Sequence, residues 1–468
     1  PGIPIFHSRD LVHWEQIGHC MTRDSQLNLE KCNMASGLWA ATVYHRDGVF
    51  YMVNTNVSGK GNYIVSAADP AGEWSEPVWV KERGIDPSLF WDDDGTAYFV
   101  STGGVNGGMA VSKIDLTTGE MLSEPVTVWI GTGDRWPEGP HIYKKDGMYY
   151  LMIAEGGGTN DGHCITIARS VNIFGPYEPC PSNPILTHHR RVSQNNSIQA
   201  LGHGDLIEAH DGSWWLVCLG IRPSGGHHVL GRETFLAPVH WPKGGWPLVN
   251  GGNPLTEKMD CPTLPQHPFP PAPKRDEFDA EKLALQWNYL RNPQRENYSL
   301  ADPKGSLSLT GSALTLDDKA NPVFVGRRQQ HTEFTATAQM EFAPASDSEI
   351  AGITVYMGEN NHYDFYLRKG GTLVLRYKLG RIEHVEKEAK VRRGPILLRV
   401  AGERGAYIFS YSDDGGKTFR TAGSPDMKFI SKENSGGFSG AYIGMYASGN
   451  GRRSRSAARF DWFEYEHN

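Results

Sequence analysis

The sequence predicts an all-β protein made of a five-bladed β-propeller followed by a β-sandwich. Residues 1–250 repeat one four-strand unit about every 50 residues, a period typical of propellers and other arrays. From residue 276 onward the repeat gives way to short apolar strands separated by Gly, Asp and Asn turns, which is typical of a sandwich. Helical periodicity is almost absent from the 468 residues, in agreement with an all-β fold.

The inner half of each propeller unit is a β-hairpin, marked by an Asp-Gly turn that precedes an aromatic, β-rich run. A short apolar run opens each hairpin eight residues before its turn. The outer half is a second pair of strands that follows the hairpin. The four turns begin at Asp47, Asp94, Asp146 and Asp211.

Five outer pairs but only four inner hairpins are present, because the first outer pair, within residues 3–17, begins the chain. A blade without inner strands would leave backbone hydrogen-bonding edges unpaired, which is unfavourable. We therefore expect the inner half of the first blade to precede Pro1. The alternative is a four-bladed propeller with a separate first hairpin.

Residues 251–275 form a proline-rich linker, which we expect to be extended and semi-rigid. The expected domains are thus a catalytic propeller over 1–250 and a C-terminal β-sandwich accessory domain over 276–468. The rigid linker favours an accessory domain that packs on the propeller. A free-standing module is the alternative.

The bulk composition argues against several classes of partner. The net charge is −7, from 53 acidic and 46 basic residues, which gives no support to nucleic-acid binding. No apolar run reaches the roughly 20 residues that a membrane helix needs. The cysteines show no metal-type spacing, and we expect Cys164 and Cys218 to be buried thiols, whereas Cys20 and Cys32 could be bridged in an oxidising compartment.

The candidate site consists of the residues that stand eight positions before the four turns, which are Trp39, Asp86, Glu138 and His203. Because the innermost strands line the axis of a propeller, side chains at one phase of the repeat should meet at one end of the channel. Taken singly, each has an ordinary explanation, as a turn residue, a solvated acid or a packed ring. Their shared phase favours a common site.

Two carboxyl groups beside an aromatic wall suit glycoside hydrolysis. One acid must stay protonated in order to donate to the leaving oxygen, and a neighbouring carboxylate would raise its pKa by like-charge repulsion. Trp39 would offer a flat apolar face to a sugar ring. His203 is open to three roles: a packed channel histidine, a sugar contact, or a ligand to a central ion.

Several motifs carry a family resemblance in combination. They are Asp86-Pro-Ser-Leu-Phe, Glu138-Gly-Pro-His-Ile-Tyr-Lys, Ala154-Glu-Gly-Gly-Gly-Thr159, Gly202-His-Gly-Asp-Leu, Gly231-Arg-Glu-Thr-Phe and the opening Pro1-Gly-Ile-Pro-Ile-Phe-His-Ser. Over nearly its whole length the chain resembles glycoside hydrolase family 43, the β-xylosidase and α-L-arabinofuranosidase group with an appended sandwich. The resemblance implies a jelly-roll, concanavalin-like sandwich that helps to close the pocket over one terminal sugar.

The resemblance also implies roles for single residues. Glu138 resembles the general acid, and Asp86 resembles the carboxylate that tunes the pKa of the acid and orients it. Arg232 resembles the arginine that contacts the sugar and steadies the base. Trp39, His203 and Thr159 are the other expected substrate-binding residues.

The general base of the family is an Asp in a His-Pro-Asp-Pro-Ser type motif, which this sequence does not contain. We expect that residue before Pro1, where it would activate water for inversion. Were the base to lie within the sequence, Asp205 and Glu155 would be the first candidates.

We therefore expect an exo-acting, inverting glycosidase that releases terminal xylose from β-1,4-xylo-oligosaccharides, terminal α-L-arabinofuranose from hemicellulose side chains, or both. A catalytically impaired carbohydrate-binding protein on the same scaffold is the alternative, because the base is not in the sequence. A propeller scaffold for protein partners is a third possibility. No cofactor is required, although a structural calcium ion at His203 is considered. The sequence leaves the compartment (cytoplasmic, periplasmic or secreted), the oligomeric state and the choice between xylose and arabinose open.

Overall fold

The computed structural model describes residues 2–159, 162–189, 198–260 and 263–467. The chain forms two compact units. The propeller unit contains Pro1–Leu27, Ser36–Pro223 and Arg232–Phe269, and the sandwich unit contains Asn28–Ala35, Ser224–Gly231 and Pro270–Asn468. Within the described ranges, none of the helices has the length and apolar character that crossing a bilayer requires.

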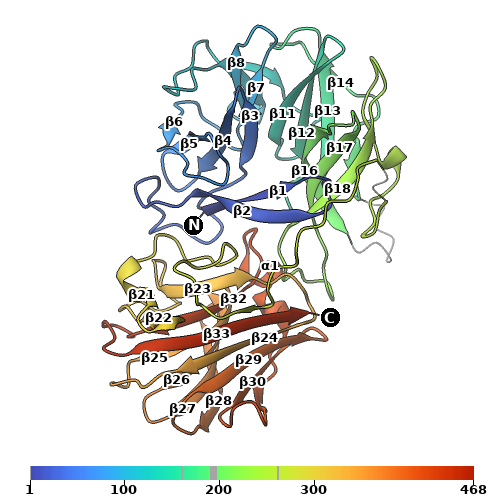
Figure 1. The fold of residues 1–468 in the computed structure, drawn as a ribbon. Helices are drawn as coiled ribbons and strands as arrows, with labels where there is room; N and C mark the ends of the chain where they lie inside the picture. Colours follow the sequence, from blue (N-terminus) through green and yellow to red (C-terminus); the bar gives the residue numbers. More distant parts are fainter. Residues whose placement is uncertain (1, 160–161, 190–197, 261–262, 468) are drawn as a thin grey trace. The chain divides into compact units, whose positions relative to one another are not determined.

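The described part of the propeller unit holds five antiparallel sheets, which are its blades (Figure 1). The first sheet has two strands, β1 (Gly2–Ser8) and β2 (Trp14–Met21). The other blades are β3 (Thr42–Arg46), β4 (Val49–Asn56), β5 (Gly61–Ala67) and β6 (Val78–Trp79); β7 (Ser88–Trp91), β8 (Ala97–Ser101), β9 (Met109–Lys113) and β10 (Val126–Trp129); β11 (Glu138–Lys145), β12 (Met148–Glu155), β13 (Cys164–Ser170), β14 (Glu178–Pro179) and β15 (Leu186–Thr187); and β16 (Gln199–Glu208), β17 (Trp214–Ile221), β18 (Glu233–His240) and β19 (Leu248–Val249).

The predicted Asp-Gly hairpins are present, and they use two kinds of turn. Asp47 has φ 52° and is followed by Gly48 at φ 80°, and Asp146 and Gly147 repeat this pair at 52° and 77°. Two successive residues with positive φ make the two-residue hairpin turn whose twist matches that of the strands. At Gly95 and Gly212 only the glycine has positive φ, and the connections are longer. All four hairpins are antiparallel pairs of neighbouring strands, as predicted.

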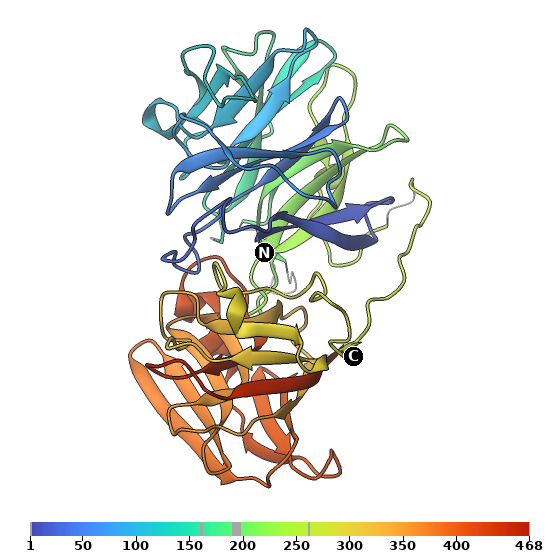
Figure 2. The ribbon, with the colours of Figure 1, turned by 60° about the vertical axis from the view of Figure 1, so that its left-hand side comes forward.

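The sandwich unit has two packed antiparallel sheets in the part that is described (Figure 2). The larger sheet contains β20 (Arg275–Asp276), β21 (Tyr298–Ala301), β22 (Lys304–Thr310), β24 (Phe334–Glu341), β29 (Ile396–Glu403), β30 (Ala406–Ser412), β31 (Arg420–Gly423) and β33 (Ala457–His467). The other contains β23 (Val323–Arg328), β25 (Ile350–Gly358), β26 (Asn361–Arg368), β27 (Thr372–Leu379), β28 (Ile382–Lys390) and β32 (Tyr442–Ser448). The described helices are single turns, which are η1 (Val105–Gly107), η2 (Asn250–Gly252), η3 (Arg295–Asn297), η4 (Met427–Ile430) and α1 (Lys432–Ser435). The predicted fold class is confirmed.

Two short segments from within the propeller sequence belong to the sandwich unit, an arrangement that the repeat pattern does not predict. In the first, the Leu29 N–H donates to Asn292 Oδ1 at 2.6 Å. In the second, Val229 O accepts from the Ala441 N–H at 2.8 Å. Backbone hydrogen bonds and buried apolar side chains thus make both segments part of the sandwich unit.

The described cysteines are buried free thiols, including Cys20 and Cys32. The expectation of buried thiols at Cys164 and Cys218 is therefore confirmed. Burial raises the pKa of the Cys164 and Cys218 thiols to about 12, which keeps both in the unreactive neutral form.

Candidate active site

The hairpin phase places the four predicted residues at equivalent positions. The Trp39 N–H donates to Thr55 O at 3.0 Å, and Glu138 pairs with Ala154. Gly202, next to His203, pairs with Leu219, and the Thr102 N–H donates to Ile85 O, next to Asp86. Each partner stands eight residues after the turn Asp, just as each predicted residue stands eight before it. The repeat therefore carries these side chains to one end of the inner strands.

The backbone is strained at this end of the propeller. Asp86, Ala200 and His203 have φ of 52°, 51° and 47°. Non-glycine residues seldom adopt this left-handed conformation, which costs about 1–3 kcal/mol each and gathers at functional sites. Strain at two of the four predicted positions supports a site there.

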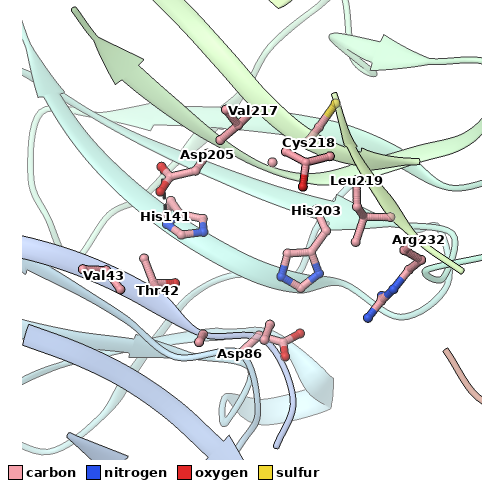
Figure 3. Close-up of a pocket in the computed structure, with 14 residues that line it drawn as sticks. Thr42, Val43, Asp86, His141, His203, Asp205, Val217, Cys218, Leu219 and Arg232 are labelled. Carbon is pink, nitrogen blue, oxygen red and sulfur yellow. Dashed lines mark ion pairs between the residues drawn. The ribbon is translucent and has the colours of Figure 1, made fainter. Parts of the chain in front are cut away.

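A cavity of about 350 Å³ lies in the propeller unit, a size within the range of small-ligand pockets. Asp86, His203 and Arg232 line it, as predicted, together with His141 and Asp205 (Figure 3). His203 lies between His141 and Arg232, and Asp86 faces it from the opposite wall (Figure 3). The wall is completed by Ala40, Ala41, Thr42, Val43, Gly204, Val217, Cys218, Leu219 and Thr234.

Three predicted residues do not line this cavity. Glu138 lies beside it, with its Oε1 atom 4.0 Å from Nδ1 of His203. Trp39 is held next to the lining residue Ala40, because the Asn54 side-chain amide donates to the carbonyl oxygens of both. Thr159 is half-buried in the turn after β12, and its predicted sugar contact stays a prediction.

Burial is the leading electrostatic effect at Glu138. It raises the pKa of the carboxyl, while the charge of Arg232 acts in the opposite direction. The sequence analysis attributed the raised pKa of the acid to repulsion from Asp86, whereas in the structure burial is its main cause. A carboxyl withdrawn from water prefers its neutral form, which is the form a proton donor needs.

Asp86 is buried next to Glu138 and accepts a hydrogen bond from the Gly139 N–H. Burial and, second, the charge of Glu138 raise its pKa to about 7, against the lowering effects of Arg232 and this hydrogen bond. Repulsion between the carboxyls therefore does act within the pair. Two groups coupled in this way titrate as a unit, so we treat Asp86 and Glu138 as a pair that holds one proton near neutral pH.

Two imidazoles at the site, those of His203 and His163, are neutral. Burial, with a smaller contribution from Arg232, lowers the pKa of His203 to about 3. Burial also lowers the pKa of His163 to about 4. The Arg232 charge beside His203 disfavours a cation, and calcium prefers oxygen ligands. The role of His203 as a calcium ligand stays a prediction.

The described residues include one group with metal-ligand spacing, Asp317, His362 and Asp364 in the sandwich unit. Arg376 and Lys378 already contact Asp317, at 2.6 Å and 3.2 Å. Because cationic side chains neutralise these carboxylates, the group is better described as a buried ion-pair network than as a metal centre.

The two reserve candidates for the base differ sharply. Glu155 is fully buried, and its carboxylate accepts hydrogen bonds from the Thr132 N–H, the Thr132 hydroxyl and the Thr166 hydroxyl. This is a structural role. Asp205 lines the cavity with its side chain about one-third exposed, and it accepts from the Tyr143 hydroxyl at 2.5 Å.

Sequence reasoning missed His141 and His163. Strict alternation along β11 would turn His141, three residues after Glu138, away from the channel. A register shift between Glu138 and His141 places both on the channel side, and such bulges leave little trace in a sequence. His163 comes from the start of an outer strand, outside the hairpin phase altogether.

Comparison with known proteins covers both units. The family model described as glycosyl hydrolases family 43 matches residues 1–247, and that of the beta xylosidase C-terminal concanavalin A-like domain matches residues 275–466. The non-reducing end alpha-L-arabinofuranosidase of Bacteroides ovatus is 40% identical over 474 residues, covering 99% of this chain and 88% of the relative. The xylosidase/arabinosidase of Butyrivibrio fibrisolvens is 39% identical over 492 residues, with 100% and 93% covered.

A solved structure is similar over the same length. The xylan beta-1,4-xylosidase from Bacillus halodurans C-125 has a TM-score of 0.93 and 32% identity, covering 100% of this chain and 94% of that one. The resemblance predicted from the motifs is confirmed, and these relatives bear the names of glycosidases rather than of binding proteins without activity. The chain therefore belongs to glycosyl hydrolase family 43 and is a glycosidase.

Proposed function

We propose that the enzyme is exo-acting and inverting, and that it releases terminal xylose from β-1,4-xylo-oligosaccharides, terminal α-L-arabinofuranose from hemicellulose side chains, or both. The observation that carries this proposal is the coupled, buried pair of Asp86 and Glu138 under the influence of Arg232. The two sugars follow from the names of the relatives, which include both activities.

In the proposed mechanism Glu138 protonates the glycosidic oxygen as the bond to the sugar breaks. Asp86 orients Glu138 and keeps the pair supplied with one proton. Arg232 contacts the sugar and limits the build-up of negative charge once Glu138 has ionised. Trp39, His203 and Thr159 are the remaining residues proposed to bind the sugar.

The remaining role is activation of water on the opposite face of the sugar. The family resemblance assigns it to the Asp of a motif that these 468 residues do not contain. Among the reserve candidates Asp205 is favoured over Glu155, because Asp205 faces the cavity and Glu155 is occupied by threonine donors.

The proposal is tested by product analysis on xylo-oligosaccharides and arabinose-decorated fragments. We expect single terminal sugars from the first minutes, and an NMR spectrum in which the released anomer has the configuration opposite to that of the substrate. Nitrophenyl β-xyloside and nitrophenyl α-L-arabinofuranoside decide between the two sugars. Internal cleavage, or a product that retains the configuration, would overturn the proposal.

No cofactor takes part in this mechanism. The calcium ion considered at His203 is tested separately, by metal analysis of the purified protein and by activity before and after chelation. A His203→Ala variant with unchanged calcium content would remove His203 as the ligand.

A further inference from the structure

His163, immediately before β13, has one ring nitrogen engaged and the other without a partner. Its Nδ1 lies 2.9 Å from the carbonyl oxygen of Ala200. Its Nε2 has no hydrogen-bond partner among the described residues and lies 4.0 Å from Oε1 of Glu138. The side chain is completely buried, so water does not reach Nε2 from the bulk.

The contact with Ala200 determines the state of the ring. A carbonyl oxygen can only accept, so the hydrogen of the neutral ring is on Nδ1. Burial lowers the pKa of His163 to about 4, and the ring is therefore neutral at working pH. Nε2 is then a lone-pair acceptor directed at Glu138, and a buried acceptor without a donor is destabilising.

The ring is fixed in place by the segment that also carries His203. A Cβ on Gly202 would lie 2.3 Å from Cε1, 2.4 Å from Nε2 and 2.5 Å from Nδ1 of His163, so the imidazole lies against the glycine backbone. The strained Ala200, at φ 51°, presents its carbonyl to the same ring. His163 therefore cannot turn away from Glu138 without losing both supports.

We propose that His163 is a positioning residue for the general acid, because its Nε2 accepts a hydrogen bond from the protonated carboxyl of Glu138 and fixes the orientation of that carboxyl. This inference rests on the proposed role of Glu138. The present separation is longer than a hydrogen bond, and catalytic contacts often tighten only when substrate is bound.

The other groups around Glu138 cannot take over this role. Arg232 is a donor only, and Asp86 is either charged or itself a proton donor, so neither is a neutral group that only accepts. His203 also lies 4.0 Å from Oε1 of Glu138, but its side chain is 14% exposed and lines the cavity, where sugar hydroxyls can satisfy it. His163 has no such access, and the Glu138 carboxyl lies 4.0 Å from its Nε2.

The experiment uses two substitutions at His163, each of which replaces only one of the two ring nitrogens. In His163→Asn the amide N–H can replace Nδ1 and keep the bond to Ala200, but nothing replaces Nε2. In His163→Gln the amide oxygen can reach the place of Nε2, but the bond to Ala200 is weakened. Thermal unfolding and circular dichroism establish that each variant is folded.

Each variant is assayed on an unactivated disaccharide and on the nitrophenyl glycoside of the same sugar, because only the poor leaving group needs protonation. We expect His163→Asn to lower kcat on the disaccharide at least ~10-fold, part of the 10²–10⁴ that general acid catalysis contributes, with KM nearly unchanged. On the nitrophenyl glycoside the loss should be less than about 3-fold. His163→Gln should retain most of the disaccharide activity.

Equal losses of His163→Asn on both substrates, or a larger loss in His163→Gln than in His163→Asn, would overturn the inference, since a structural ring would act through Ala200. Glu138→Gln serves as the reference. If Glu138→Gln is selective for poor leaving groups and His163→Asn is not, this inference alone fails. If Glu138→Gln is not selective, the proposed acid fails with it. Gly202→Ala, whose Cβ would displace the ring, should reproduce the selectivity of His163→Asn.

Discussion

Replacing Asp86 by Asn should move the high-pH limb of the rate profile to lower pH. That limb reports loss of the proton from the general acid in the free enzyme when kcat/KM is measured. In the wild type the charge of one carboxyl opposes ionisation of the other, and this repulsion contributes to the pKa of about 7 at Asp86. Asn keeps the shape of the side chain but removes the charge, so Glu138 should ionise more readily.

The size of the effect follows from the charges around the pair. Two unit charges about 7 Å apart in a medium with an effective dielectric constant of about 20 repel by ~2.4 kcal/mol. This corresponds to ~1.7 pH units. Arg232 lowers the pKa of both groups and compensates part of the repulsion. We therefore expect the limb to move down by about 1 pH unit.

The assay measures kcat/KM between pH 4 and 9 on a substrate with a poor leaving group. A nitrophenyl leaving group needs little protonation, so its rate would not report the ionisation of the general acid. Asp205→Asn is the matched control, since it removes a different carboxylate that lines the same cavity. A limb that stays in place in Asp86→Asn, or that moves equally in Asp205→Asn, would refute the coupling between Asp86 and Glu138.

Three further results are expected. Glu138→Gln should lower kcat by about 10²–10⁴-fold on disaccharides and far less on nitrophenyl glycosides, as steady-state rates on both would show; equal losses would contradict the acid role. Glu155→Gln should lower the Tm measured by calorimetry, because hydrogen bonds to a charged group contribute about 1.5–3 kcal/mol each, while the pH profile of the folded enzyme stays the same; loss of the low-pH limb would instead point to a base. Burial alone would lower the pKa of His362, but Asp364 and Asp317 raise this pKa to about 9. The protonated His362 should therefore stabilise the fold by about 3 kcal/mol below pH ~6.5, and this contribution should be lost as pH rises through ~9. The Tm of the wild type should fall over this pH window, and the fall should be smaller in His362→Gln. An unchanged fall would exclude His362 as the source of the pH dependence.

Much of the fold could be predicted from the sequence because the propeller repeats a local signal. Each Asp-Gly turn sets the register of its hairpin, and the register determines which residue reaches the end of the inner strand. The phase argument therefore found Asp86 and Glu138 without knowledge of the contacts between blades. The segments Asn28–Ala35 and Ser224–Gly231, which belong to the sandwich unit, do not interrupt the repeat. The repeat therefore could not predict where they pack.

The parts of the site that could not be predicted depend on departures from regularity. His141 reaches the cavity through a register shift, and His203 adopts a positive φ. His163 is brought to Glu138 by the pairing of β12 with β13 and is held by Gly202 and Ala200 from another blade. The contacts of His163 with Gly202 and Ala200 arise between sheets, where the period of a single repeat carries no information.

Burial and hydrogen-bond donors distinguish the two glutamates of this blade, Glu138 and Glu155, which stand at the beginning of β11 and the end of the paired strand β12. Both are glutamates on paired strands, and the eight-residue phase selects Glu138 but says nothing about the state of its carboxyl. Donors from Thr132 and Thr166 occupy the oxygens of Glu155, which leaves that carboxylate no freedom to meet a substrate. Around Glu138 the structure places a second carboxyl and the acceptor nitrogen of His163 instead. The neutral ring of His163 has no hydrogen on Nε2 to donate, and the charge of an ionised Asp86 opposes ionisation of Glu138, so both neighbours favour a Glu138 carboxyl that carries its proton. The chemistry of the acid therefore follows from the neighbours that the blades bring to it, and changing those neighbours should weaken acid catalysis even where the Glu138 carboxyl itself is kept.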